Sequence, residues 1–329
     1  MSSFRPEKIT ELPFTVSHPA AVLPLMRRPF VPAALVAGSV APDVPYFLAR
    51  LGISETSPQD WYGPLLNATE THSFDAGLLV NLPLAVGLVA VYRMLRAPVT
   101  ALLPPGFGLQ EPERVPGLRA KARHVMWLLA SALIGIASHL AWDSFTHGDG
   151  FLVMHVEGLQ ASALGGLTVA RLLQYVSTVF GLAVVGRHLW RRRGRLRTQG
   201  GTVARLGPVM RWSVVGLLVL SPVLAGAVHA RADFNAYRHV TEVDYSRPNT
   251  VDLGDGASET TYPSRTVRAP WGTLAEGVLT EAATRAGAAF AVTLLLYAAA
   301  WQFGAVTRRP AGRTSSTLSV RSSTPPPSG

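Results

Sequence analysis

Cysteine is absent from this chain of 329 residues. Disulfides and thiolate metal sites are therefore excluded, and His, Asp and Glu remain as the available metal ligands. Charged residues are scarce as well, at 15% of the chain, whereas 48% of the residues are hydrophobic. This composition departs from that of soluble globular proteins towards that of membrane proteins.

Two sequence signatures are also missing. The N-terminus, MSSFRPEKITELPF, has no basic stretch followed by an uninterrupted apolar core and a small-residue cleavage site, so we expect no cleavable signal peptide. No HExxH motif occurs, which argues against a zincin protease. The net charge of +10 comes almost entirely from arginines beside apolar runs, a pattern that indicates membrane topology and no nucleic-acid partner.

Five apolar runs approach the length of about 20 residues that a helix needs to cross the hydrocarbon core. They cover residues 77–95, 126–146, 167–189, 212–230 and 283–304. A further apolar stretch, residues 29–49, is interrupted by prolines and by Asp43, so it predicts a broken span or one half of a hairpin with residues 15–26. We therefore expect an all-α polytopic membrane bundle with five clear spans plus an N-terminal broken or re-entrant helical hairpin.

Arginine and lysine in the short connections give the predicted orientation. They gather between the first two spans, between the third and fourth, and after the last, and these regions are expected to be cytoplasmic. Residues 147–166 and 231–282 are then external, and the second connection is long enough to form a small cap. We predict a single domain, residues 1–305, that contacts the lipids of the inner (cytoplasmic) membrane. The tail, residues 306–329, is rich in Ser, Thr and Pro, so we expect it to be disordered and cytoplasmic.

The segment MWLLASALIGIASHLAWDSFTH, residues 126–147, places polar groups at the end of an apolar run. His139, Asp143 and His147 are spaced i, i+4, i+8, so they share one face of a continuous helix and can converge on a cation. Burying such groups in a membrane without partners would be costly, and metal binding is the leading explanation. The competing interpretation is a polar network between packed helices.

Other polar residues fall at the same predicted level, the external ends of the spans. They are Asp43 in GSVAPDVPYF, His72 and Asp75 in THSFDAG, and His229 and Asp233 in AVHARADF, where the i, i+4 spacing recurs. His18, in TVSHPAAVLPL, reaches this level only if residues 15–49 form a hairpin that turns near Arg27.

A mixed set of His and Asp suits zinc, because Zn²⁺ accepts imidazole nitrogen and carboxylate oxygen, whereas carboxylates alone would favour Mg²⁺ or Ca²⁺. Catalytic zinc sites keep one position open for water, which then ionises near pH ~7 and supplies a hydroxide nucleophile. We therefore expect a divalent metal, zinc by preference, near the external face, with Asp43 or Asp75 as orienting group or base. The candidate ligands are His18, Asp43, His72, His139, Asp143, His147, His229 and Asp233.

The phrases PFTVSHPAAVLPL, GSVAPDVPYF, THSFDAG and SHLAWDSFTH resemble a bacterial family of multi-spanning membrane proteins known only as a domain of unknown function, over most of residues 12–305. The order of the polar residues also resembles inner-membrane metal-dependent hydrolases and, more distantly, the zinc-dependent phospholipase C and S1/P1 nuclease superfamily. In that superfamily the ligands follow the order His, Asp, His, HxxxD, His and HxxxE. The resemblance implies ligand roles for His18, Asp43, His72, His139, Asp143 and His147, with His229 and Asp233 in place of the last pair.

The preferred interpretation is a membrane-embedded metal-dependent hydrolase that acts on a phosphoester, with a lipid as a plausible substrate. One alternative is a transporter, or an ion or proton pathway, that uses the same His and Asp residues. Polar residues that continue to the cytoplasmic side would favour transport, and the sequence offers few of them there. The other alternative is a metal-stabilised membrane protein without turnover, which requires a closed coordination shell.

Overall fold

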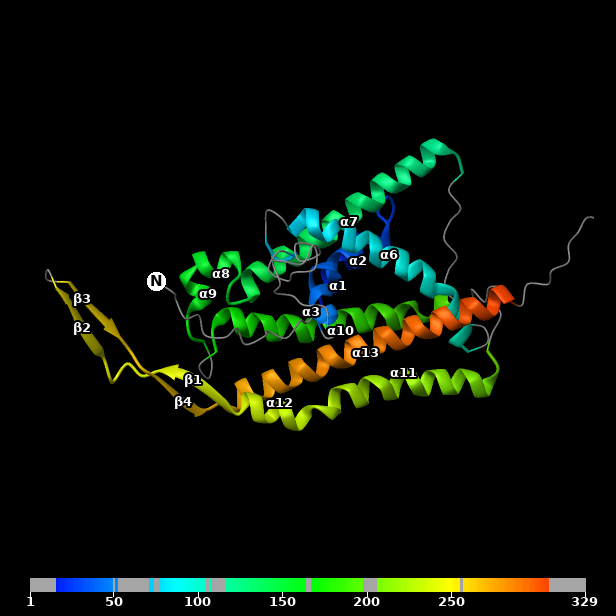
Figure 1. The fold of residues 1–329 in the computed structure, drawn as a ribbon. Coiled ribbons are helices and arrows are strands. Elements are labelled where there is room, and N and C mark those ends of the chain that lie inside the picture. Colours follow the sequence, from blue (N-terminus) through cyan, green and yellow to red (C-terminus); the bar gives the residue numbers. More distant parts are fainter. Residues whose placement is uncertain are drawn as a thin grey trace, which may run out of the picture.

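The computed structural model describes residues 16–49, 51–52, 71–73, 77–104, 107, 116–163, 167–197, 206–254 and 257–307. Its framework is a bundle of long helices (Figure 1). These are α6 (Gly77–Leu102), α7 (Leu118–Thr146), α10 (Val169–Arg197), α11 (Pro208–Val228) and α13 (Trp271–Thr307). In this described part, five helices are long and apolar enough to cross a membrane, so the chain is an all-α polytopic bundle, as predicted.

The outer surface of the bundle is apolar, as expected for helices in contact with lipid. α11 has no buried residue, and its Val219, Leu220 and Leu224 side chains are more than half exposed. Figure 1 shows α11 along the edge of the bundle, beside α13. In water such a surface would promote aggregation, whereas lipid tails solvate it as well as they solvate one another.

α13 begins at Trp271, well before the apolar run predicted to start at residue 283. Its first turns carry polar side chains that have partners on other helices. Glu276 pairs with Arg171 of α10, and Glu281 accepts a hydrogen bond from Tyr237, the last residue of α12 (Ala230–Tyr237). Because these partners satisfy the polar groups, the helix continues where hydropathy alone predicts a connection.

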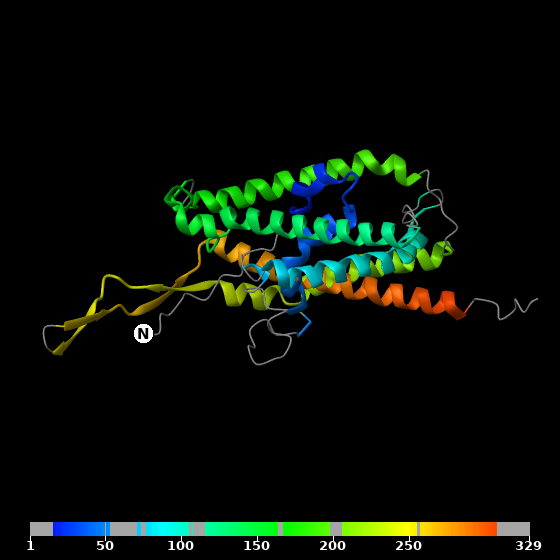
Figure 2. The ribbon, with the colours of Figure 1, turned by 90° about the horizontal axis from the view of Figure 1, so that it is seen from above.

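The N-terminal segment folds into short helices: α1 (Pro19–Val22), η1 (Leu23–Leu25), α2 (Pro32–Val40), η2 (Ala41–Asp43) and α3 (Val44–Ala49). A proline stands in the first turn of each of the first four, where it starts a new helix and cannot continue the preceding one. α2, the longest, has nine residues and is about 14 Å long, roughly half the thickness of the hydrocarbon core. Figure 2 shows these helices in blue among the long ones, so the segment is broken into short helices, as predicted.

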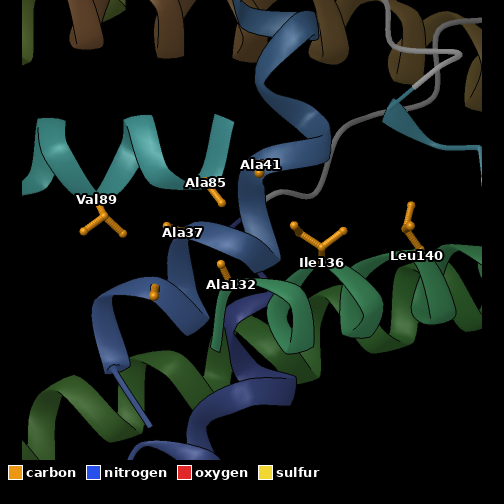
Figure 3. Close-up of a cluster of buried hydrophobic side chains, with 8 residues drawn as sticks. Ala37, Ala41, Ala85, Val89, Ala132, Ile136 and Leu140 are labelled. Atoms are coloured by element: carbon orange, nitrogen blue, oxygen red, sulfur yellow. The ribbon is translucent and has the colours of Figure 1, made fainter. Parts of the chain in front are cut away.

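α2 packs against α6 and α7 through small side chains. Figure 3 shows this apolar cluster, with Ala37, Ala41, Ala85, Val89, Ala132, Ile136 and Leu140 labelled. Gly38 and Gly135 bring the backbones of α2 and α7 into contact. A Cβ on Gly38 would overlap the carbonyl oxygen of Ala132, and a Cβ on Gly135 would lie 2.8 Å from the amide nitrogen of Ser39. This close approach places the end of α2 beside the second half of α7.

A β-ribbon joins α12 to α13. Strand β1 (His239–Val243) pairs antiparallel with β4 (Ser264–Arg268), and β2 (Asn249–Gly254) pairs with β3 (Ala257–Thr261). The connection that is long enough for a cap thus forms a ribbon, which projects beyond the bundle (Figure 1). We call this side the ribbon end; α7 and α11 finish there, and α10 and α13 begin there. α13 finishes at Thr307, and the remainder of the predicted disordered tail lies outside the described residues.

Candidate metal centre

Side chains from four parts of the chain meet near the ribbon end. They are His18, just before α1; Asp43, the last residue of η2; His72, in a turn; and His139 and Asp143, on α7. Candidate ligand atoms lie within 4.8 Å of one another in two overlapping groups, one of His18, Asp43 and His139 and the other of His72, His139 and Asp143. We refer to these five residues as the His/Asp centre.

The two carboxylates of the His/Asp centre lie between the imidazole rings. Asp143 Oδ2 is 2.9 Å from His139 Nε2 and 3.6 Å from His72 Nε2, and Asp143 Oδ1 is 3.7 Å from His18 Nε2. Asp43 Oδ1 is 3.5 Å from His72 Nε2 and 3.6 Å from His139 Nε2. The rings of His18 and His139 stack, with their centroids 4.0 Å apart. Three imidazole nitrogens and two carboxylates therefore face one small volume.

The His/Asp centre is buried. His139 is fully buried, Asp43, Asp143 and His18 are nearly so, and the side chain of His72 is 24% exposed. Within the described ranges, the ion pairs of both carboxylates are with histidines and none is with Lys or Arg. Because isolated buried carboxylates are very costly, this arrangement calls for a cation or for protons.

His139 is held so that Nε2 points into the centre. Its Nδ1 lies 2.9 Å from the carbonyl oxygen of Ser39, which can only accept, so Nδ1 carries the proton and donates it. Nε2 of the neutral ring then presents a lone pair towards the carboxylates, 2.9 Å from Asp143 Oδ2. A backbone carbonyl that accepts from the second ring nitrogen is the usual support of a metal-binding histidine.

Thr71 orients His72 in the same way. A hydroxyl has one proton, and Thr71 donates it to the carbonyl oxygen of Pro42 at 2.9 Å. The same hydroxyl must therefore accept from His72 Nδ1, 3.2 Å away, so that His72 Nε2 presents its lone pair to the two carboxylates. Asn81 of α6 fixes this turn by donating to the carbonyl oxygen of Thr71 at 2.7 Å.

His18 depends on the hairpin predicted over residues 15–49, and the structure brings it to the level of Asp143. α1 packs on α10 at Gly181, where an added Cβ would lie 2.8 Å from the Cβ of Ser17. This contact holds Ser17 against α10. The ring of the next residue, His18, then lies over the ring of His139.

His147 borders the His/Asp centre. α7 ends at Thr146 and His147 has an extended backbone, so the predicted continuous helical face stops at Asp143. The chain turns back here, since Gly150 lies so close that its Cβ would be 2.6 Å from the carbonyl oxygen of Asp143. His147 Nδ1 lies 3.3 Å from Asp143 Oδ1, and His147 Nε2 lies 3.2 Å from the amide nitrogen of Gln174.

The remaining predicted site residues are not brought to the centre in the described part of the chain. His229 is exposed at the end of α11. Asp233 is buried in an ion pair with both terminal nitrogens of Arg285 of α13, at 2.5 and 3.0 Å. This guanidinium neutralises Asp233 and joins α12 to α13. Asp75 lies outside the described residues.

Sequence reasoning assigned no site role to Ser39, Thr71 and Gln174, which orient the histidines. One signal was available, because the dipeptide Thr-His occurs at 71–72 and again at 146–147. In both places the threonine hydroxyl lies within hydrogen-bond distance of the following Nδ1, at 3.2 and 3.3 Å. Ser39 acts through its backbone carbonyl, for which side-chain patterns give no signal.

The fold and the site define a polytopic helical membrane protein with a cluster of His and Asp residues that could hold a metal ion. The chain belongs to the DUF4184 family, described as a domain of unknown function, whose profile matches residues 12–299. The predicted membership of an uncharacterised family is thereby confirmed. No curated protein and no solved structure matches the chain, so the similarity to metal-dependent hydrolases stays a prediction.

Proposed function

We propose that the protein is a membrane-embedded metal-dependent hydrolase that acts on phosphoesters, with phospholipids as the favoured substrate class. The observation that carries this proposal is the convergence of three imidazole nitrogens and two buried carboxylates. Two ionised carboxylates give a charge of −2, which a divalent cation balances. Mixed nitrogen and oxygen donors favour zinc over Mg²⁺ or Ca²⁺.

Bound zinc would supply Lewis acidity and an activated water. The protein side chains hold and orient the reactants around it. Asp43 Oδ2 is buried and has no hydrogen-bond partner among the described residues, which suits an oxygen that orients the attacking water and accepts its proton. Because the His72 side chain is the most exposed of the five, we assign the approach of substrate to its edge of the centre.

The depth of the centre supports a lipid substrate. Asp143 lies in the last turn of α7, which ends at Thr146. The ends of spanning helices lie at the level of the polar headgroups, where phospholipid phosphoesters are found. A soluble substrate would reach the same level only from the aqueous side.

We place the ribbon end outside and the C-terminus in the cytoplasm of a bacterial inner membrane. Arginines gather at the opposite end of the bundle, at residues 191–193 of α10 and at Arg211 of α11, as the positive-inside rule requires. The guanidinium of Arg193 lies 3.6 Å from the centroid of the Trp190 ring, an arrangement typical of the membrane interface.

Core packing disfavours the transporter alternative. Ile136 and Ala132, one and two turns before His139 on α7, are fully buried against the apolar side chains of Ala85 and Val89 (Figure 3). This apolar layer lies between the His/Asp centre and the arginine-rich end. A closed structural zinc site takes four ligands, whereas the centre offers five candidates, one of them partly exposed.

The test is phosphoester hydrolysis by the purified full-length protein in phospholipid mixed micelles, before and after chelation, with Zn²⁺ or Mn²⁺ added back. We expect turnover that the chelator abolishes, and a kcat at saturating metal at least about 100-fold lower in Asp43→Asn, the range of a lost general base. Asp244→Asn, which changes a carboxylate on the ribbon, away from the His/Asp centre, is the matched control. Metal-loaded wild type without turnover on phospholipids and on soluble phosphodiesters would contradict the hydrolase.

A further inference from the structure

A chain of polar contacts leads from the His/Asp centre across α10 to α13. Asp143 Oδ1 lies 3.3 Å from His147 Nδ1, and His147 Nε2 lies 3.2 Å from the Gln174 amide nitrogen. Gln174 Oε1 accepts a hydrogen bond from Arg171 at 2.9 Å, and Arg171 forms an ion pair with Glu276 at 2.9 Å. Gln174, in the middle of this polar chain, is 3% exposed.

The proton positions in the polar chain follow from its charged member. Arg171 can only donate, so the oxygen of Gln174 faces Arg171 and the amide N–H of Gln174 faces His147. His147 Nε2 therefore accepts, and the ring proton lies on Nδ1. The contacts of Thr146 are consistent with a proton on Nδ1. Its hydroxyl donates to the carbonyl oxygen of Trp142 at 3.0 Å and can then accept from His147 Nδ1 at 3.3 Å.

A metal ligand needs a free lone pair, and neutral imidazole has one. On His147, Gln174 occupies that lone pair, and the N–H edge of the ring lies 3.3 Å from both Asp143 Oδ1 and the Thr146 hydroxyl oxygen. His18, His72 and His139 differ, because each turns Nε2 towards the carboxylates of the centre.

We propose that His147 is a positioning residue for Asp143 and not a metal ligand, and that Gln174, held by the Arg171–Glu276 ion pair, fixes the ring of His147. The inference rests on the proposed metal centre. An N–H edge beside Asp143 Oδ1 orients the carboxylate and leaves Oδ2 for the cation. Loss of such an outer partner typically lowers metal affinity about 10- to 100-fold without changing the donor set.

Cobalt binding to the full-length protein in detergent separates a ligand from a positioning residue. For His147→Leu and Gln174→Leu we expect a Kd for Co²⁺ raised about 10- to 100-fold. At saturation the d–d bands should keep their wild-type position and intensity, because the same donors remain. The matched control is Gln302→Leu, which removes an amide that donates to the Met94 carbonyl oxygen at the opposite end, and it should keep the wild-type Kd.

Altered d–d bands in His147→Leu would make His147 a ligand and overturn the inference, and so would a wild-type Kd in Gln174→Leu. If Gln174→Leu does not fold, Glu276→Gln keeps the side-chain size and removes the charge that holds Arg171. We expect this variant to raise the Kd several-fold, and an unchanged Kd would equally overturn the inference. Wild type that binds no Co²⁺ would overturn the centre and the inference together. Co²⁺ binding with these Kd changes but without hydrolysis would support the inference and contradict only the hydrolase.

Discussion

Two clusters of buried charge lie near the ribbon end, and their carboxylates have different partners. In the His/Asp centre, Asp43 and Asp143 pair with imidazoles, and neither pairs with Lys or Arg in the described part of the chain. In the second cluster, Arg285 binds both oxygens of Asp233 and also binds Glu281 at 2.9 Å. We refer to these three residues as the arginine cluster.

The difference distinguishes a structural contact from a candidate binding site. The arginine cluster contains its own cation, so its ion pairs form as α12 packs on α13. The carboxylates of the His/Asp centre have no such cation and are expected to take one from solution, so that metal binding adds to the free energy of folding. Changes in the arginine cluster should therefore affect stability alone, and changes in the centre should affect metal content.

The largest expected effect follows from removing the cation of the arginine cluster. Arg285→Leu leaves Asp233 and Glu281 buried without a guanidinium and should lower the free energy of unfolding by about 3–5 kcal/mol. Denaturation of the detergent-solubilised protein measures this loss. Neutralising both carboxylates in the same chain, with Asp233→Asn and Glu281→Gln, should recover much of it. The folded fraction of Arg285→Leu should keep the metal content of wild type. Loss of metal from this fraction would contradict a purely structural role for the arginine cluster.

Metal removal should have the next largest effect, and it should act through the His/Asp centre. Free Zn²⁺ at 100 times its Kd stabilises the folded state by about 2.7 kcal/mol. A chelator should therefore lower the thermal midpoint of wild type and of Asp233→Asn, and should leave that of His139→Ala unchanged. An equal midpoint for wild type with and without chelator would show that no metal is linked to folding.

The contact between α2 and α7 links the stability of the fold to the metal affinity of the His/Asp centre. Gly135→Ala places a methyl group against the backbone of Ser39 and should cost about 1–3 kcal/mol, the range of overpacked cores. Because the Ser39 carbonyl orients His139, metal affinity should fall as well. Gly216→Ala on α11 is the control, since an added Cβ there meets nothing within 4 Å. A Gly135→Ala variant with wild-type stability and metal affinity would contradict the close packing.

The smallest expected effect lies in the β-ribbon, away from both clusters. Hydrogen bonds from the side chain and the backbone of Ser246 lower the pKa of Asp244. Since the folded pKa is depressed, the stabilisation is present above the ordinary aspartate pKa and is lost as the pH falls through the folded value. In Ser246→Ala, NMR titration should show this pKa shifted upwards at unchanged metal content. An unchanged pKa would contradict the role of the Ser246 hydroxyl.

Much of the fold could be predicted because lipid requires long apolar helices. Four of the five predicted apolar runs coincide with α6, α7, α10 and α11. Most of these helices extend several residues beyond the run at one end. The start of α13 could not be predicted, because its polar first turns are stabilised by partners distant in sequence. Arg171 and Tyr237 precede their partners on α13 by many residues, and local hydropathy cannot predict contacts between residues so far apart in sequence.

In the candidate site, too, local spacing could be predicted from the sequence, and contacts between distant residues could not. Spacing alone places His139 and Asp143 on one helical face, and their 2.9 Å contact agrees with it. The pair His229 and Asp233 has identical spacing, yet Asp233 is bound by Arg285, 52 residues further along the chain. Spacing predicts which side chains share a face of a helix, whereas the tertiary contacts determine which cation they meet.

Elemental analysis of the detergent-purified protein tests the metal centre most directly. Wild type and Arg285→Leu should each contain a stoichiometric divalent metal, zinc by preference, and His139→Ala and Asp143→Ala should both lose it. Folded wild type that remains free of metal after reconstitution would contradict the centre, and protonated histidines would then have to balance its two carboxylates.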